Sequence, residues 1–341
     1  MLSLAIETSC DETSIAVLNN ETVLSNVISS QLFHTKYGGV VPEVASREHL
    51  KKIVEITEIA LKNADIKLSD IKIICATSEP GLIGALLIGL NYGKALSMCL
   101  NIPFIPVNHI HAHLYSNFLN NSKINFPFIS LIVSGGHTLL ILAEDFFKHK
   151  IIGKTVDDAA GEAFDKVAKL LGLGYPGGPL IDKYAKSGNE NFHKFPESVL
   201  KNNEFDFSFS GIKTSVRYFL KDIDFESIKN ESLVNDICAS FQKAVVNTLF
   251  NKTYLAAKKY GVKEISVSGG VSANSYLKSK FNSLSESGYK INFPVLEYST
   301  DNAAMIGLTG YLKYKYSVNK SILINETLFQ NAKPKLDYEN F

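Results

Sequence analysis

The chain has 341 residues, which exceeds the usual size of a single hydrophobic core, so two domains are expected. Hydrophobic residues make up 45% of it and charged residues 20%, proportions that are typical of a soluble globular protein. The formal net charge of +1 excludes a global electrostatic attraction to nucleic acid, so any RNA-binding surface must be local or supplied by a partner.

The four cysteines, Cys10, Cys75, Cys99 and Cys238, form no close pair. Their spacing fits neither a disulfide framework nor a zinc ribbon, and it favours a reducing compartment. The first ten residues show no basic region and no long apolar run, so no signal peptide is expected. The most apolar stretch, residues 81–90, is too short to span a bilayer. We therefore expect a cytoplasmic protein that does not contact a membrane.

The first hundred residues alternate between strand and helix patterns. Residues 1–20 predict a strand, a polar turn and a second strand, and residues 47–63 have helical apolar spacing. A buried strand over 71–81, an apolar helix over 82–100 and a short strand over 102–107 follow. This order predicts an α/β domain.

The strand-turn-strand pattern recurs at residues 126–145, about 125 residues after the first. The string VSGG also occurs twice, at 133–136 and 267–270, each time after an apolar run. These repeats suggest an internal duplication. We predict a first domain over 1–107 and a second over 108–341.

Two long helices are expected within the second domain. One covers 155–172 and starts at Thr155 as N-cap with Asp158 as capping-box partner. The other is an amphipathic helix over 235–261. Together they predict a helical insertion at about 155–260.

Three small-residue turns could bind an anion. Turns of Gly, Ser, Thr and Asp at 7–13 and 134–138 present several backbone N–H groups in one direction, and glycine lets a ligand approach the backbone. Residues 266–274 lead from a strand into a helix, whose N-terminus can hold an anion or the edge of a nucleotide. An ordinary hairpin or strand-helix connection is the alternative at each.

The helix over 155–172 places Asp158, Glu162 and Asp165 on one face. A solvated acidic face is one interpretation, and an acceptor for ligand hydroxyls is the other. The rigid turn at 174–180 could form a pocket wall or a plain loop.

Histidines occupy three alternate positions, His109, His111 and His113. In a strand all three would point one way, whereas in a helix His109 and His113 share a face and His111 points away. The following residues look helical, which favours the second arrangement. Two histidines one turn apart are a common metal-ligand pair, and Asp301, just before an apolar helix, is a candidate third ligand. The alternative role for Asp301 is a helix N-cap, for which Ser299 and Thr300 compete.

Eight motifs in one order cover nearly the whole chain: IETSCDET, PGLIGALLIG, NHIHAH, LIVSGGHT, DDAAGEAFDKVAKLLGLGYPGGP, FSFSGIKT, VSGGVSAN and STDNAAMIG. Together they closely resemble the bacterial TsaD family. The resemblance implies an actin/Hsp70/sugar-kinase fold with two duplicated domains and a ligand cleft between them. It also implies transfer of a threonylcarbamoyl group from threonylcarbamoyl-adenylate to N6 of adenosine 37 in tRNAs that read codons beginning with A, with release of AMP.

The resemblance carries over to individual residues. Its metal ligands match His109, His113 and Asp301, and acidic residues of its first turn match Asp11 and Glu12, either of which could accept the proton of the attacking amine. Its substrate-binding residues match nine further positions: Ile132, Val133, Ser134, Gly135, Gly136, Asp165, Gly178, Asp182 and Asn274.

The histidine motif departs from the family pattern, which often has Glu-Gly where this chain has His111 and Ala112. His111 could compete as a ligand. The resemblance implies one divalent metal per subunit, with Fe²⁺ expected first and Zn²⁺ as the alternative, because histidine and carboxylate ligands do not separate them. It further implies a TsaB-like paralogue and a TsaE-like P-loop ATPase as partners, with the anticodon loop of tRNA as substrate.

Three other functions compete with the transferase. A small-molecule kinase or ATPase of the same fold would share the glycine turns but has no need of the histidine pair. A metallopeptidase is disfavoured because the chain has no H-E-x-x-H motif. A noncatalytic scaffold subunit would be expected to lose the metal ligands, which are all present here.

Overall fold

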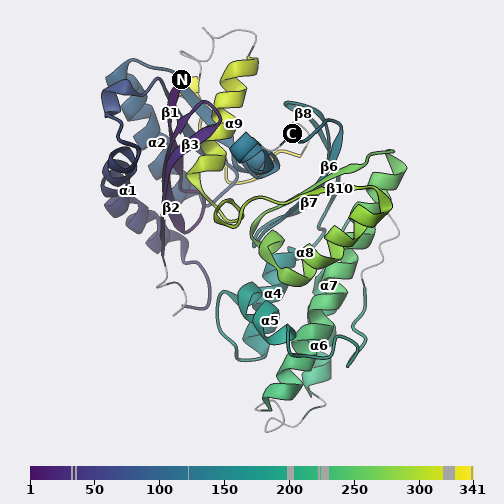
Figure 1. Cartoon of the computed structure of the whole chain (residues 1–341). Helices are drawn as coiled ribbons and strands as arrows, with labels where there is room; N and C mark the ends of the chain where they lie inside the picture. The colour runs from purple at the N-terminus through teal and green to yellow at the C-terminus, as the bar shows by residue number, and fades with distance from the viewer. Residues whose placement is uncertain are drawn as a thin grey trace. The chain divides into compact units, whose positions relative to one another are not determined.

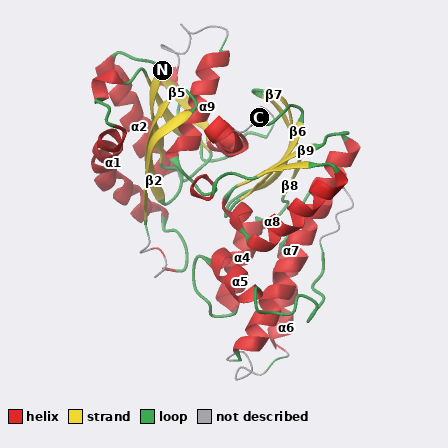
Figure 2. Ribbon diagram, viewed as in Figure 1, coloured by secondary structure: helices red, strands yellow, loops and turns green. Residues whose placement is uncertain are grey.

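The computed structural model describes residues 1–31, 34, 37–121, 123–197, 203–221, 223, 230–317, 327–338 and 341 (Figures 1 and 2). The chain forms two compact units. Residues 1–123 and 294–341 make up the first, and residues 124–293 make up the second. Each unit has its own sheet and its own hydrophobic core.

The first unit is a five-stranded sheet covered by helices. Its sheet has the order β3-β2-β1-β4-β5, in which β1 pairs antiparallel with β2 and parallel with β4. Its strands and helices are β1 (Leu2–Glu7), β2 (Glu12–Asn19), β3 (Thr22–Ser30), α1 (Pro42–Ala64), β4 (Ile73–Glu79), α2 (Ile83–Leu100), β5 (Phe104–Asn108), α3 (His109–Tyr115) and α9 (Ala303–Tyr316).

The second unit has the same strand connectivity with more helices. Its sheet has the order β10-β9-β6-β7-β8, in which β6 pairs antiparallel with β7 and parallel with β9. Its strands and helices are β6 (Phe128–Val133), β7 (Thr138–Asp145), β8 (Lys148–Lys154), α4 (Ala160–Leu170), α5 (Gly177–Ala185), α6 (Ser210–Lys221), α7 (Glu231–Lys259), β9 (Glu264–Ser268), α8 (Ser275–Asn282) and β10 (Lys290–Asn292).

The two sheets confirm the predicted duplication. Strands β1 to β5 and strands β6 to β10 follow one another in the same spatial order, with an antiparallel meander on one side and two parallel strands on the other. The two predicted strand-turn-strand repeats are β1–β2 and β6–β7. The two VSGG strings lie at the carboxyl ends of the neighbouring parallel strands β6 and β9, where Ile132 faces Ser268 in register.

The compact units do not coincide with the predicted division at residues 107 and 108. Helix α9 returns to the first sheet, where Gly307 lies against Leu18 and Gly310 against Cys75 so closely that a Cβ atom would overlap either neighbour. The backbone N–H of Ala303 also donates to Ser14 Oγ at 2.9 Å. The C-terminal residues therefore belong to the first unit, because their apolar helix completes its core.

Helix α2 confirms the apolar helix predicted over residues 82–100, and it extends well beyond the most apolar stretch at 81–90. Among the described residues it is the one helix that is long and apolar enough, by length and composition, to cross a membrane. Here its glycines bring it onto the first sheet, where Gly89 lies against Thr8 and Gly93 against Phe104. The contact makes one face of α2 part of the core of the first unit.

The predicted start of the helix at Thr155 is wrong. Helix α4 begins at Ala160, and its N-cap, Ala159, makes no side-chain capping bond. Thr155 instead pairs with Phe207 in an isolated β-bridge, and its hydroxyl donates to the carbonyl of Asp158 at 2.6 Å. The expected long amphipathic helix is α7, which begins at Glu231, capped by Asn230.

Candidate metal centre and ligand-binding turns

The predicted metal ligands of the first unit lie at the carboxyl edge of its parallel strands. Strand β1 ends at Glu7, β4 at Glu79 and β5 at Asn108. Because parallel strands end at the same edge of a sheet, residues that directly follow them converge. Helix α3 starts there, directly after β5, and brings the histidines to this edge.

The histidine segment is a helix, which confirms the second of the two predicted arrangements. The side chain of Asn108 caps it by accepting from the backbone N–H groups of Ile110 at 2.8 Å and His111 at 3.2 Å. His109 and His113 meet edge to face, with ring centroids 4.6 Å apart. His111 contacts the ring of Phe341 instead, with centroids 4.5 Å apart.

Asp301 completes a three-residue cluster. Its Oδ1 lies 3.1 Å from His113 Nε2 and 3.4 Å from His109 Nε2. One ligand atom from each residue falls within 4.8 Å of the other two, a grouping that could hold a metal ion. Asn302 is the N-cap of α9, where it accepts from the N–H of Met305 at 3.0 Å. The capping role predicted as an alternative for Asp301 is therefore filled by its neighbour.

Glu7 supports this cluster and was missed by the sequence analysis. Its Oε2 lies 3.0 Å from His109 Nδ1 and accepts from the Thr77 hydroxyl at 2.7 Å. The other carboxylate oxygen accepts from the backbone N–H of Ser9. A carboxylate on Nδ1 fixes the tautomer of a histidine and leaves Nε2 free to bind a metal. The one signal in the sequence was the place of Glu7 at the end of a predicted strand.

The electrostatics of the cluster favour a cation. Burial opposes the charge on His109, but Asp301 and Glu7 outweigh it and hold the pKa of the imidazole well above its ordinary value. Burial likewise opposes ionisation of Asp301, yet His109 keeps the pKa of that carboxyl well below its usual range. Burial lowers the pKa of His113. The two carboxylates give the cluster a net negative charge, and a divalent metal would take the place of the proton on His109 Nε2, so this donor set fits such an ion.

The predicted acid residues Asp11 and Glu12 lie in the turn between β1 and β2. Burial, the nearby carboxylate of Asp301 and a hydrogen bond with Asp11 raise the pKa of Glu12 to about 9. At neutral pH the pair therefore holds a proton on Glu12. His49 supports the turn, because its Nε2 lies 2.9 Å from the carbonyl oxygen of Cys10.

The glycine turn of the second unit is a tight hairpin between β6 and β7. The N–H of Ser134 donates to the carbonyl of His137 at 2.8 Å, with Gly135 and Gly136 exposed at the tip. The side chains of Ile132 and Val133 are buried in the core, so these two residues offer a ligand only their backbone.

Two glycines bring neighbouring elements onto this hairpin. Gly161, at the start of α4, donates its N–H to the carbonyl of Ser134 at 3.2 Å, and Gly269 lies against the backbone of Val133. A Cβ atom at either glycine would overlap that backbone. Both turns predicted to bind an anion in this unit are thus brought together.

The remaining predicted ligand residues lie on α4 and α5 and directly before α8. Asp165 accepts from the N–H of Gly177 at 2.7 Å, and burial raises the pKa of its carboxyl. A Cβ atom at Gly178 would meet nothing within 4 Å, so this side of α5 is open. Asp182 accepts from the hydroxyl of Ser275 at 2.8 Å. These contacts bind α5 to both α4 and the start of α8.

Asn274 has a structural role. Its Oδ1 accepts from the N–H of Leu277 at 2.9 Å, which caps α8, and its amide donates to Gln242 at 2.6 Å. One donor and one acceptor position remain for a ligand.

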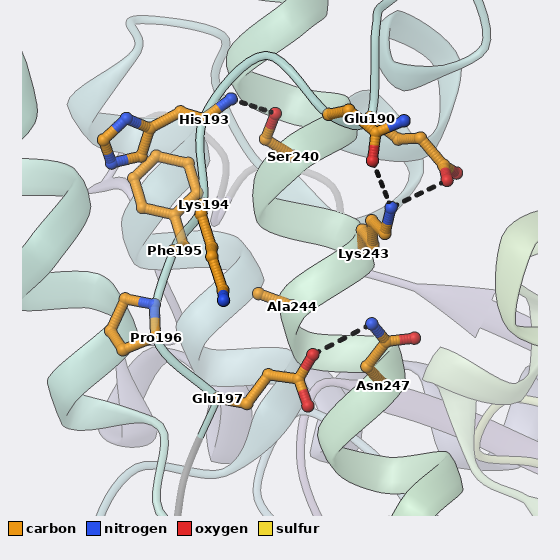
Figure 3. A pocket seen from close by; sticks show the side chains of 11 residues that line it. Glu190, His193, Lys194, Phe195, Pro196, Glu197, Ser240, Lys243, Ala244 and Asn247 are labelled. Carbon is orange, nitrogen blue, oxygen red and sulfur yellow. Dashed lines mark hydrogen bonds and ion pairs between the residues drawn. The ribbon is translucent and has the colours of Figure 1, made fainter.

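A cavity of about 740 Å³ lies elsewhere in the second unit (Figure 3). It is formed by residues 190–197 and α7, and none of the predicted site residues lines it. Its polar groups bond to one another, as Lys243 does to Glu190 at 2.9 Å and Asn247 to Glu197 at 3.0 Å.

Comparison with known proteins identifies the family. The family model for TsaD, tRNA N6-adenosine threonylcarbamoyltransferase, matches residues 22–308. The chain belongs to the TsaD family. A protein of this name from Chloroherpeton thalassium is 50% identical over 339 residues, covering 96% of each chain. Another from Clostridioides difficile is 50% identical over 318 residues, covering 92% of this chain and 93% of its own.

Solved structures confirm the actin-like fold. Full-length HypF, in its phosphate- and nucleotide-bound form, matches with a TM-score of 0.61 at 15% identity over 94% of this chain and 47% of its own. Component A of (R)-2-hydroxyglutaryl-CoA dehydratase from Acidaminococcus fermentans matches with a TM-score of 0.53 at 14% identity, covering 92% and 99%. At such identities the likeness extends to the fold alone.

Proposed function

We propose that this TsaD-family chain transfers a threonylcarbamoyl group from threonylcarbamoyl-adenylate to N6 of adenosine 37 in tRNAs that read codons beginning with A. The observation that carries this proposal is the similarity to threonylcarbamoyltransferases over almost the whole chain, together with the cluster of His109, His113 and Asp301. A kinase or ATPase of the same fold would not need that cluster, and a noncatalytic paralogue would not retain it.

The chemistry asks the protein mainly for positioning. The donor is a mixed anhydride, so its carbonyl is already activated. The adenine amine attacks the carbonyl carbon, the bond from that carbon to the phosphate oxygen breaks, and AMP leaves with the electron pair. The amine is a poor nucleophile because its lone pair is delocalised into the ring. Holding donor and acceptor in line therefore supplies much of the rate enhancement.

The second unit supplies groups for the nucleotide half of the donor. The two exposed glycines of the hairpin, Gly135 and Gly136, and the turn that precedes α8 present backbone N–H groups to the phosphate. The lone pairs of Asp165 that are not taken by Gly177 accept from the ribose hydroxyls. The open side of Gly178 leaves room for the ligand beside them.

The first unit supplies groups for the reacting half. His109, His113 and Asp301 hold one divalent metal, for which we propose Fe²⁺ with Zn²⁺ as the alternative. When bound, the metal supplies a Lewis acid for the threonylcarbamoyl end. Glu7 keeps His109 in the tautomer that presents Nε2. Because the proton of the carboxyl pair rests on Glu12, we propose Asp11 as the acceptor of the proton that the amine loses.

We further propose a TsaB-like paralogue and a TsaE-like P-loop ATPase as partners in the cytoplasm. An exposed apolar patch on the first unit suits the paralogue: Leu50 and Val54 on α1 and Leu87 on α2 are 64%, 51% and 41% exposed. A Cβ atom at Gly84 would overlap Ser46 Oγ, so the two helices that carry these exposed side chains pack closely against each other. Such a patch is typical of a protein–protein interface.

The test is nucleoside mass spectrometry of tRNA from cells depleted of this protein, with and without its return. We expect threonylcarbamoyladenosine to disappear and to return with the wild type. A normal level of the nucleoside, in cells that carry no second copy of the enzyme, would overturn the proposal in favour of the kinase.

A further inference from the structure

Positive charge is concentrated in one segment of the second unit. Residues 251–293 contain seven lysines and two glutamates, a net charge of +5. The whole chain carries +1, so the other residues together carry four net negative charges. This segment comprises the end of α7, β9, α8 and β10. It is a candidate for a local basic surface that the overall charge of the chain conceals.

Four of these lysines lie over a continuous row of aromatic rings. Phe250 contacts Tyr254 and Phe281, with centroids 6.0 and 5.5 Å apart, Tyr254 contacts Tyr289 at 5.5 Å, and Phe281 contacts Phe293 at 6.5 Å. The ammonium groups lie 4.0 to 5.9 Å from ring centroids of this row. We name this surface the basic–aromatic strip; it consists of four lysines over four rings, with the buried Phe281 linking two of those rings. The pairs are Lys258 over Tyr254, Lys263 over Tyr289, Lys278 over Phe293 and Lys280 over Phe250.

The strip lysines are available to an anion. Within the described part of the chain none of the four forms an ion pair. Two other lysines of the segment are engaged: Lys259 pairs with Glu204, and Lys290 pairs with Glu264 at 2.7 Å. Lys258 and Lys263 are exposed. The rings hold the lysine stems in place, which lowers the entropy that the side chains lose on binding.

The strip is continuous with the ligand-binding turns of the same unit. Asn274 caps α8, and the N–H of Lys278 donates to the carbonyl of Asn274 at 3.1 Å. Lys278 therefore lies one helical turn from a residue of the predicted donor site, and Lys280 follows on the same helix. A polyanion on the strip would extend to that site.

We propose that the basic–aromatic strip binds the sugar–phosphate backbone of the substrate tRNA, an inference that rests on the proposed function. Lysines over ring faces leave those faces covered, so the strip is suited to contacting phosphates rather than stacking bases. Phosphate contacts carry no sequence information. That suits an enzyme that accepts several tRNAs and selects the adenosine in its active site.

The test compares three variants of the full chain in equilibrium binding to a tRNA transcript across a salt series. The strip variant carries Lys258→Gln, Lys263→Gln, Lys278→Gln and Lys280→Gln. The matched control loses the same charge at exposed lysines elsewhere: Lys62, Lys67, Lys72 and Lys169, each changed to Gln. The third variant has arginine at the four strip positions, which keeps the charge. Thermal unfolding checks that all three fold.

We expect the strip variant to lower the slope of log affinity against log salt by about 3, since each phosphate contact contributes about 0.7 to 0.9. Its affinity at about 0.1 M salt should fall by roughly 10- to 100-fold, and its KM for tRNA in the complete transfer reaction should rise in parallel. The control and the arginine variant should bind as the wild type does.

Three results would overturn the proposal that the strip binds tRNA. One is a strip variant whose salt slope and KM match those of the control, and another is a wild-type chain that does not bind tRNA. The third is a strip variant that keeps tRNA but loses binding to phosphatidylglycerol vesicles, which would assign the surface to a membrane. Failure of the proposed function is distinct, because it would appear as absence of transfer with every protein, the wild type included.

Discussion

The two units of this chain share one strand order but use the carboxyl edges of their sheets differently. In the first unit that edge carries ionisable side chains, namely Glu7, His109 and, from α9, Asp301. In the second unit it carries glycines and backbone, with Gly135 and Gly136 at one turn and Gly269 at the next. A duplicated scaffold thus carries a candidate metal site in one copy and, in the other, the glycine turns for which we propose a nucleotide.

The difference follows from what each ligand needs. A divalent metal needs lone pairs, which imidazole and carboxylate side chains supply at fixed positions. A phosphate needs several N–H donors that point the same way, and only bare backbone lets it approach them closely. The first unit should therefore be sensitive to loss of a side chain, whereas the second should be sensitive to gain of one.

The largest effect is expected from loss of a metal ligand. His109→Ala or His113→Ala should reduce bound metal from about one per chain to a small fraction and slow transfer by at least about 10³-fold, because the two remaining ligands would not hold the metal for which we propose a Lewis-acid role. Metal analysis by mass spectrometry and single-turnover transfer measure both quantities.

His111→Ala is the matched control, because it removes an imidazole from the same helix but not from the cluster. It should keep the metal and most of the activity. Transfer that persists in His109→Ala without bound metal would remove the metal from the reaction. Loss of the metal in His111→Ala would show that His111, at which the chain departs from the family pattern, is itself a metal ligand.

A smaller effect is expected from a methyl group added to the second unit. Gly269 has φ +87, and a Cβ atom there would overlap the backbone of Val133. Gly269→Ala should lower the free energy of unfolding by about 3 kcal/mol, measured by urea denaturation. Gly178→Ala meets nothing within 4 Å, so it should change stability by less than about 1 kcal/mol and weaken donor binding instead.

The two glycine variants separate strain from ligand contact. If Gly178→Ala lowered the free energy of unfolding as much as Gly269→Ala, the space beside Gly178 would not be open to a ligand. Unchanged stability in Gly269→Ala would mean that β6 and β9 can move apart, and the close approach of the two turns would then not be required.

The repeat of strand-turn-strand and the VSGG strings predicted the duplicated fold, because alternation and glycine turns are local signals. The sequence did not predict which of the two sheets α9 packs against. Helix α9 has apolar residues on several sides, and its choice of the first sheet depends on Gly307 and Gly310 meeting Leu18 and Cys75, contacts made across more than 200 residues. The domain boundaries depended on that long-range packing.

The candidate site, like the fold, could be predicted from the sequence only in part. Helical spacing predicted that His109 and His113 share a face, and the following helix pointed to Asp301. Glu7 could not be found from spacing, because it lies 102 residues from His109 and the two meet only through the parallel pairing of β1, β4 and β5. The start of α4 was misplaced because Thr155 resembles an N-cap in sequence while its hydroxyl bonds to Asp158.

The smallest effect concerns Glu12 and follows from its raised pKa of about 9, compared with an ordinary value of 4.5. Below pH 4.5 the carboxyl is protonated in both the folded and the unfolded chain. Between pH 4.5 and 9 the unfolded chain releases the proton while the folded chain retains it. The folded state then binds more protons, so stability falls as pH rises through this window.

Because glutamine does not titrate, the stability of the Glu12→Gln variant should not fall in this way as the pH rises. In chelator-treated protein we expect the variant and the wild type to unfold at similar urea concentrations at pH 5, and the variant to be more stable by on the order of 2 kcal/mol at pH 8. The exposed Glu43→Gln on α1 should show the same difference from wild type at both pH values. The stability difference between Glu12→Gln and the wild type could instead stay constant or narrow from pH 5 to pH 8. That result would mean that Glu12 is ionised at neutral pH, and Glu12 would then be a candidate proton acceptor beside Asp11.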